Sequence, residues 1–138
     1  MSGQDLLTHS QLQPPGWEKP RGYANGVSAR GRIIHCAGQI GWNAECAFES
    51  DDLVDQIAQA LRNILAVLAC DRAGPEHVTN LVWYFVDKRE YVARLSEVGQ
   101  VYRDVMGRNY PAMTAVQVMA LVEDRAKVEI QATAVVPD

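Results

Sequence analysis

The chain has 138 residues, enough for one domain with a substantial apolar core. Its formal net charge of -4 argues against a nucleic-acid-binding surface, because such surfaces neutralise phosphates with an excess of basic residues. No apolar run reaches the roughly 18 residues that a membrane span requires. Three cysteines without a CxxC pair are typical of a reducing cytoplasm, so we expect a cytoplasmic protein. From the charge and the lack of a long apolar run, we expect it to bind neither nucleic acid nor membrane.

The N-terminal segment, residues 1–20, is predicted to be an extended arm because it is polar and interrupted by prolines. It lacks the basic start and apolar middle of a targeting peptide. Residues 21–138 contain no repeat or linker and are predicted to form a single domain. Within them, residues 32–41 (RIIHCAGQIG) predict a strand that leaves through a glycine turn, with Val27 and the residues before it as its candidate hairpin partner.

Two helices are expected in the middle of the chain. Residues 50–70 repeat apolar side chains every three or four positions, which predicts the clearer helix. Residues 90–106 predict a second helix that ends near Gly107, and Pro111 prevents any continuation. Between the helices, residues 77–87 are rich in β-branched and aromatic side chains, which predicts a strand buried on both faces.

Two further strands are expected at the end of the chain, over residues 114–122 and 126–136. The intervening EDR, residues 123–125, is predicted to be a tight hairpin turn. The element order is therefore β-β-α-β-α-β-β, an α/β (α+β) fold in which two helices pack on one face of a β-sheet.

The other face of this sheet is expected to be half apolar and half polar, which is a poor solvent surface. Such a face is better explained as an oligomer interface with polar clefts, so we expect a homo-oligomer. The residues assigned to this face are Met119, Leu121, Val135, Gln117, Glu129 and Gln131.

Five segments occur in the order and spacing of one known family: RGYANGV, CAGQIG, QIAQALRNILAVL, YPAMTAVQV and KVEIQATAVV. Over about residues 20–136 the chain resembles the Rid/YjgF family, whose best-studied members are RidA-like and which is also labelled the L-PSP endoribonuclease family. The resemblance implies a chorismate-mutase-like fold and a homotrimer with ligand clefts between neighbouring subunits. It also implies hydrolysis of reactive enamines and imines to a 2-oxo acid and ammonia, without a metal or organic cofactor.

The resemblance assigns a catalytic role to Glu129, whose carboxylate would position or activate the attacking water as acid and base. A structural carboxylate that pairs with a cation on the polar face is the alternative. Tyr23 and Trp42 would form cleft walls around a planar ligand, although Trp42 could equally pack as core. The positions assigned to substrate binding, with main-chain groups near the glycine turn and Ala115, are Tyr23, Gly38, Gln39, Ile40, Gly41, Trp42 and Ala115.

The chain departs from the family pattern at two positions. Met113 stands where the family has a carboxylate-binding arginine, and Gly99 stands where it often has an asparagine. A thioether cannot bind a carboxylate but suits an apolar or aromatic ligand, and the alternative is that Met113 only fills space at a subunit interface. Arg125, in the turn before the last strand, is the first candidate for a replacement cation, and Arg21 is the weaker one. Arg125 could equally be solvated.

Two functions follow from these patterns. The first is a hydrolase of small enamines or imines whose substrate is aromatic or apolar rather than a short 2-imino acid. The second is a non-catalytic ligand-binding trimer that senses a metabolite. No phosphate loop, dinucleotide-binding glycine pattern or pair of residues with metal-ligand spacing occurs, so we expect neither cofactor nor metal.

Overall fold

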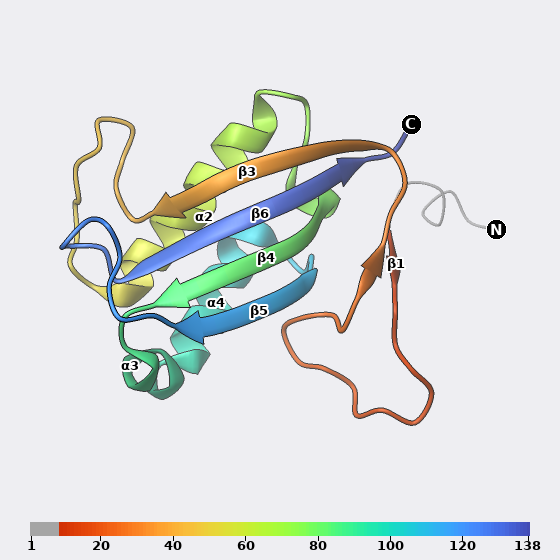
Figure 1. The fold of residues 1–138 in the computed structure, drawn as a ribbon, viewed down its shortest axis with the longest axis horizontal. Helices are drawn as coiled ribbons and strands as arrows, with labels where there is room; N and C mark the ends of the chain where they lie inside the picture. The colour runs from red at the N-terminus through yellow and green to blue at the C-terminus, as the bar shows by residue number, and fades with distance from the viewer. Residues whose placement is uncertain (1–8) are drawn as a thin grey trace.

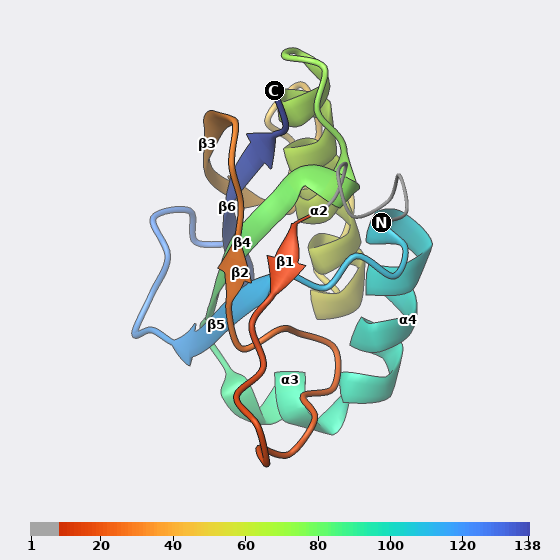
Figure 2. The same ribbon diagram turned by 90° about the vertical axis from the view of Figure 1, so that its right-hand side faces the viewer.

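The computed structural model describes residues 9–138. Its centre is a four-stranded sheet in the order β3-β6-β4-β5, with helices on one face only (Figure 1). Figure 2 shows the two layers from the side, with the small β1-β2 pair at the β5 edge of the sheet. The elements are β1 (Ser10–Gln11), β2 (Val27–Ser28), β3 (Arg32–Ile40), α2 (Leu53–Ala69), a 3-10 turn (Pro75–His77), β4 (Val78–Phe85), α3 (Lys88–Ala93), α4 (Leu95–Met106), β5 (Ala112–Gln117) and β6 (Val128–Val136).

Helix α2 confirms the clearer helix prediction. Asp52 caps its N-terminus, where the carboxylate accepts a hydrogen bond of 3.1 Å from the main-chain N–H of Asp55. Its apolar stripe lies fully buried against β3 and β6, so this helix forms most of one wall of the core. The stripe includes Ile57, Leu61, Ile64 and Leu68.

The second predicted helix is divided into two. α3 ends at Ala93 and α4 begins at Leu95, because Arg94 between them leaves helical geometry with φ -116° and ψ 23°. The guanidinium of Arg94 is held by Asp52 at 2.6 Å and by Glu97 at 2.8 Å. A continuous apolar spacing therefore did not imply a continuous helix, because the chain bends at Arg94, whose side chain pairs with the distant Asp52. α4 stops at Gly107, as predicted, with a positive φ of 69°.

Two hairpin predictions are wrong. β2 pairs with β1 rather than with β3, so the arm supplies its partner strand. β5 pairs with β4 in parallel, whereas β6 lies between β3 and β4 and is antiparallel to both. The connection from β5 to β6 must therefore pass β4, so the predicted hairpin is wrong, although a tight turn does form at residues 123–126, where the N–H of Ala126 donates to the carbonyl of Glu123 at 3.0 Å. Residues 118–127 form this crossing loop, which contains Met119 and Leu121 instead of placing them in a strand.

The side chains of β6 alternate between the two faces as predicted. Val128 and Ile130 pack in the helix-covered core, while Glu129 and Gln131 point to the other side of the sheet. Gln117 was assigned to the wrong face, because its side-chain oxygen accepts a hydrogen bond of 2.8 Å from the N–H of Lys88 on the helix side.

The face without helices is called here the open face. It carries apolar as well as polar side chains, including Ile33, whose exposed fraction is 62%. On β4 the residues that face the helices are buried, whereas Val82 and Tyr84 on the open face are only half-buried. We predicted that β4 would be buried on both faces. Within residues 9–138 it is fully buried only on the face toward the helices. In the same range no helix is long and apolar enough to cross a membrane.

Candidate ligand-binding site

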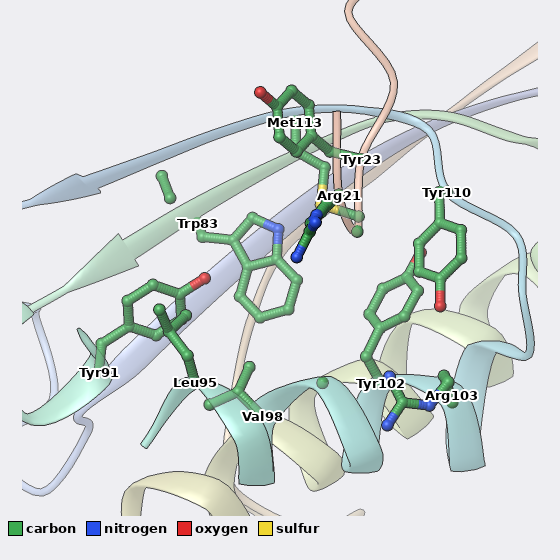
Figure 3. A pocket seen from close by; sticks show the side chains of 13 residues that line it. Arg21, Tyr23, Trp83, Tyr91, Leu95, Val98, Tyr102, Arg103, Tyr110 and Met113 are labelled. Carbon is green, nitrogen blue, oxygen red and sulfur yellow. The ribbon is translucent and has the colours of Figure 1, made fainter. Parts of the chain in front are cut away.

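A cavity of about 580 Å³ lies between α4 and the β4-β5 edge of the sheet (Figure 3). This volume falls within the range usual for small-molecule sites, about 300–1,000 Å³. Residues from the arm, both strands and both short helices contribute to its walls. They are Arg21, Gly22, Tyr23, Trp83, Tyr91, Leu95, Val98, Gly99, Tyr102, Arg103, Tyr110, Met113 and Ala115.

Residues 21–24, which follow the arm, close one side of the cavity because main-chain hydrogen bonds hold them in place. The N–H of Ala24 donates to the carbonyl of Pro111 at 2.9 Å, directly before β5. The N–H of Leu12 donates to the carbonyl of Gly26 at 2.9 Å and extends the β1-β2 pairing. Gly22 turns the chain with a φ of 78°. These contacts bring Tyr23 beside Met113 at the cavity mouth (Figure 3).

Five of the thirteen residues that line the cavity are aromatic. Tyr102 and Tyr110 stack with ring centroids 5.4 Å apart, and Trp83 lies 6.3 Å from Tyr102. The hydroxyl of Tyr102 donates to the carbonyl of Asn109, and burial raises the pKa of this phenol well above its ordinary value. The pKa of Tyr91 is also raised by burial. Both phenols are therefore neutral at pH 7, and these side chains present ring surfaces suited to a planar ligand.

Two arginines are the charged residues of the cavity lining. In Figure 3 the guanidinium of Arg21 points inward below Met113, toward Trp83. Arg103 approaches from α4, where one of its nitrogens lies 3.4 Å from the point that a Cβ on Gly99 would occupy. The absence of a side chain at position 99 therefore leaves the space beside this guanidinium open.

A second cluster lies toward the opposite edge of the sheet, where β3 pairs with β6. The register of this strand pair shifts between Cys36 and Gln39, and Gly38 lies in the irregular segment. A Cβ on Gly38 would be 2.9 Å from the Cδ of Glu129, so the carboxylate of Glu129 lies directly over this glycine. Ile40 pairs with Glu129. Within residues 9–138 the Glu129 carboxylate has no hydrogen bond or ion pair.

Neighbouring loops are fixed to this second cluster by a buried amide. The side-chain nitrogen of Gln56 donates to the carbonyls of Ser50 and Arg125 at 3.1 and 3.0 Å, and its oxygen accepts from the N–H of Lys127 at 2.8 Å. Gly41 allows the approach, because a Cβ there would lie 2.5 Å from the Cβ of Gln56.

Trp42 and Arg125 lie outside the lining of the cavity. The ring of Trp42 packs 6.0 Å from the ring of Phe48. The guanidinium of Arg125 lies 5.3 Å above that same Phe48 ring and pairs with Asp51 at 2.9 Å. Of the two candidate replacement cations, Arg21 lines the cavity beside Met113 and Arg125 does not.

The chain matches a known protein family over most of its length. The model described as Endoribonuclease L-PSP matches residues 18–136, nearly the whole chain. The chain belongs to this family. It is 30% identical over 118 residues to a RutC family protein of Pyrococcus horikoshii, covering 84% of this chain and 89% of the relative.

Solved structures support the same relationship, and they extend it to the Rid and YjgF labels. A Rid family protein of unknown function from Yersinia pestis superposes with a TM-score of 0.83 at 30% identity, covering 94% of this chain and all of the other. A member of the YjgF/YER057c/UK114 family from Mycobacterium tuberculosis has a TM-score of 0.63 at 31% identity, covering 83% and 87% of the two chains. The mixed α and β architecture predicted from the sequence is that of the Rid family.

Within the Rid family fold, the sequence-predicted site residues divide between two places. Tyr23, Met113 and Ala115 line the cavity on the helix side of the sheet. Gly38 and Glu129 lie together on the open face. The remaining predicted residues, Gln39, Ile40, Gly41, Trp42 and Arg125, belong to the β3 end and its loops.

Sequence reasoning did not find the residues that give the cavity its depth. Trp83 and Tyr102 are the main examples, since their side chains converge only when β4 packs on α4. Arg103 had a local signal, because it stands four residues after Gly99 and thus on the same face of the helix. No group of three or more His, Cys, Asp or Glu side chains in residues 9–138 is arranged to hold a metal ion.

Proposed function

We propose that this Rid family protein hydrolyses reactive enamines or imines that carry an aromatic or apolar group, releasing ammonia and a carbonyl product. The observation that supports this best is the cavity of about 580 Å³ with an aromatic lining. Such a lining favours a planar or apolar ligand over the short 2-imino acids that smaller, more polar clefts would accept. Met113 fits this preference, because a flexible thioether packs well against rings.

The chemistry requires proton transfers that one carboxylate can perform. An enamine first accepts a proton at carbon and becomes an iminium ion. Water then adds to the iminium carbon and gives up a proton to the Glu129 carboxylate. The resulting carboxylic acid returns this proton to the amine nitrogen, the C–N bond breaks and ammonia leaves. The hydroxyl proton passes to solvent as the carbonyl forms, which replaces the proton that solvent supplied to the enamine carbon. The unpaired carboxylate over Gly38 suits this role, because no neighbouring cation in residues 9–138 neutralises it.

The reaction requires a second copy of the chain. Glu129 is on the open face, whereas the cavity lies on the helix side of the same sheet. A ligand bound in the cavity of one chain could therefore meet only the Glu129 of a neighbour. We propose a homotrimer in which the open faces pack together, since these faces carry half-buried and exposed apolar side chains.

The test generates imines in solution with an amino-acid oxidase and follows ammonia release and trapping by semicarbazide. We expect the protein to accelerate hydrolysis of the imine from phenylalanine more than that from alanine. Glu129→Gln should lower this rate by about 100-fold, a common size for loss of an acid–base group. The control is Glu76→Gln, an exposed carboxylate at the 3-10 turn, which should retain the wild-type rate. Equal rates for both variants would contradict the role of Glu129.

A second candidate function is ligand binding without turnover, as in a metabolite sensor. It is favoured by the position of Glu129 outside the lining of the cavity, because binding there does not require this carboxylate. Tight binding of an aromatic ligand with no acceleration of hydrolysis for any imine would identify this function instead.

A further inference from the structure

The segment between the two main-chain anchors near the N-terminus makes few contacts with the rest of the fold. The anchors are the hydrogen bonds from Leu12 to Gly26 and from Ala24 to Pro111, and residues 13–23 between them are called here the strap. In the part of the chain that the structure describes, no group of the strap forms a hydrogen bond or ion pair with residues 27–138. The strap can therefore move as a unit about its two ends.

Local hydrogen bonds give the tip of the strap a defined shape. The N–H of Trp17 donates to the carbonyl of Pro14 at 3.2 Å and closes a tight turn, in which Gly16 has a φ of 84°. The side-chain nitrogen of Gln13 donates to the carbonyls of Trp17 and Glu18, each at 3.2 Å. These bonds lie within the strap, so its tip keeps its form while the strap moves.

Gly22 gives the strap a hinge beside the cavity. Its φ of 78° is left-handed, and no atom lies within 4 Å of the point that a Cβ would occupy. No close neighbour holds this residue in its conformation, and glycine adopts positive and negative φ values with similar ease. Segments that close over ligands turn on a few such loop residues, which absorb the change in φ and ψ.

The strap encloses a second cavity, of about 300 Å³, between its two ends and Tyr110. Gly22, Tyr23 and Tyr110 line both this space and the main cavity, so they stand between the two. Protein interiors are closely packed and contain few voids larger than a water molecule. A strap that was closed on the body would fill the second cavity, so the structure leaves it room to move inward.

The strap also exposes aromatic surface. Trp17 at its tip is 62% exposed, and Tyr23 at the mouth of the main cavity is 43% exposed. Figure 1 shows the loop between β1 and β2, which contains the strap, projecting beyond the β5 edge of the sheet. Apolar surface gains free energy when it leaves water, and the ring of a bound ligand would offer Trp17 a surface on which to pack.

We propose that the strap is a lid that closes over the mouth of the main cavity when an aromatic ligand binds. Arg21 and Tyr23 already line the cavity, and closure brings Trp17 from solvent onto the ligand. The closed strap contacts the ligand more extensively than the open one, so binding shifts the strap toward closure and slows release. The lid rests on the proposed function for the aromatic class of the ligand, and it applies equally to a hydrolase and to a sensor.

The experiment follows the three tryptophans by fluorine NMR after incorporation of 5-fluorotryptophan, with phenylpyruvate as the probe ligand. Trp17→Phe and Trp42→Phe assign the signals. Trp83 lines the cavity and reports binding, whereas Trp42 lies outside the lining and serves as the internal control. We expect the Trp17 signal to shift between light and heavy water in the free protein, as an exposed fluorine does, and to lose this shift at saturating phenylpyruvate.

Several outcomes would overturn the lid. A change in the Trp83 signal without any change at Trp17 would show binding without closure. A Trp17 signal that is shielded from water in the free protein would mean that a neighbouring copy covers this side chain. If phenylpyruvate changes none of the three signals, the aromatic class of ligand fails and the lid fails with it. Closure without imine hydrolysis would remove the hydrolase function and leave the lid standing.

A rate measurement tests the same closure by substitution. Trp17→Ser should raise the dissociation rate of phenylpyruvate about tenfold and leave the association rate nearly unchanged, because lost contacts act mainly on dissociation. Stopped-flow measurement of the change in intrinsic fluorescence on binding gives both rates. The control is Val67→Ser, which removes a 39% exposed apolar side chain on α2, outside the cavity lining, and should leave both rates unchanged. Equal dissociation rates for the two variants would contradict the lid.

Discussion

At the scale of single residues, Gly38 has a role that depends on what it lacks. The Glu129 carboxylate occupies the space where a Cβ on residue 38 would lie, with Cδ at 2.9 Å and Cγ at 3.0 Å from that point. Gly38 does not need its conformational freedom, since its φ is not in the left-handed region. Its function is to leave room for a neighbouring side chain, and an added methyl group would have to displace that side chain.

Gly38→Ala should therefore reduce activity without unfolding the protein. Displacing a reacting group by about 1 Å can cost about 100-fold in rate, so we expect a loss of that order in kcat/KM on an aromatic imine. The melting temperature should change little, because Glu129 is only partly buried and can rotate away. The decisive comparison is the double variant Gly38→Ala with Glu129→Gln. If Gly38 acts through Glu129, the double variant is no slower than Glu129→Gln alone.

The site residues differ in how far the sequence predicts them. Side chains alternate between the two faces of the sheet along β6, and this alternation alone places Glu129 on the open face. The position of Arg21 in the cavity lining could not be predicted from the residues next to it in the sequence. It depends on the hydrogen bond between Ala24 and Pro111, which joins segments almost ninety residues apart and turns the arm toward the cavity.

At the scale of elements, Arg94 joins two helices that are distant in sequence. It ends α3, precedes α4, and binds the Asp52 carboxylate that caps α2. Its hydrogen bonds lower the pKa of Asp52 and of Glu97 below their ordinary values. A carboxyl group whose pKa is lower in the folded state stabilises the protein above its unfolded pKa, near 4. This contribution is lost as the pH falls through the folded-state value.

Arg94→Gln should consequently flatten the dependence of stability on pH in acid. At pH 6 the variant should melt at a lower temperature than the wild type, and the gap should narrow as the pH falls from 5 to 3. Thermal unfolding followed by circular dichroism at several pH values measures this gap. Arg89→Gln, an exposed arginine on α3, serves as the control and should follow the wild-type curve. A gap that stays constant down to pH 3 would contradict the assigned ion pairs.

The elements also show where sequence patterns stop being informative. The stripe of α2 is a local pattern, so its position was predicted closely. The pairing of strands is not local. β5 has the composition of a hairpin partner for β6, yet it is parallel to β4 and separated from β6 by that strand. Residue propensities predict which segments form strands. Which strands become neighbours in the sheet depends on how their apolar faces pack against the helices.

At the scale of the whole molecule, the open face is the surface most in need of a partner. Val82 lies on this face at the middle of β4, paired with Gln131 of β6. Exposed Ile33 and Val116 extend the apolar area to both edges of the sheet. An apolar area of this kind, on the sheet face that no helix covers, is typical of a subunit interface.

Val82→Asp should dissociate the assembly that we propose. The wild type should sediment with three times the 15.3 kDa mass of one chain, whereas the variant should sediment as a monomer because three buried carboxylates would repel one another. Activity on imines should disappear with the trimer, since Glu129 would no longer meet a cavity. Val92→Asp, on the exposed outer side of α3, should remain trimeric. A monomeric wild type that is active would exclude the shared site.

The central place of β6 has a consequence for how the chain reaches its native state. Arg32 of the edge strand β3 pairs with Val136 of β6, so a central strand of the sheet pairs with a segment about a hundred residues before it in the sequence. Such long-range closure slows folding, because the entropy of closing a long loop is lost before the strand contacts form. During synthesis β3 and β4 cannot join, because the strand between them has not yet been translated. The apolar stripes of α2 and α4 then stay partly uncovered until the final strand is synthesised, and exposed apolar surface of this kind favours aggregation.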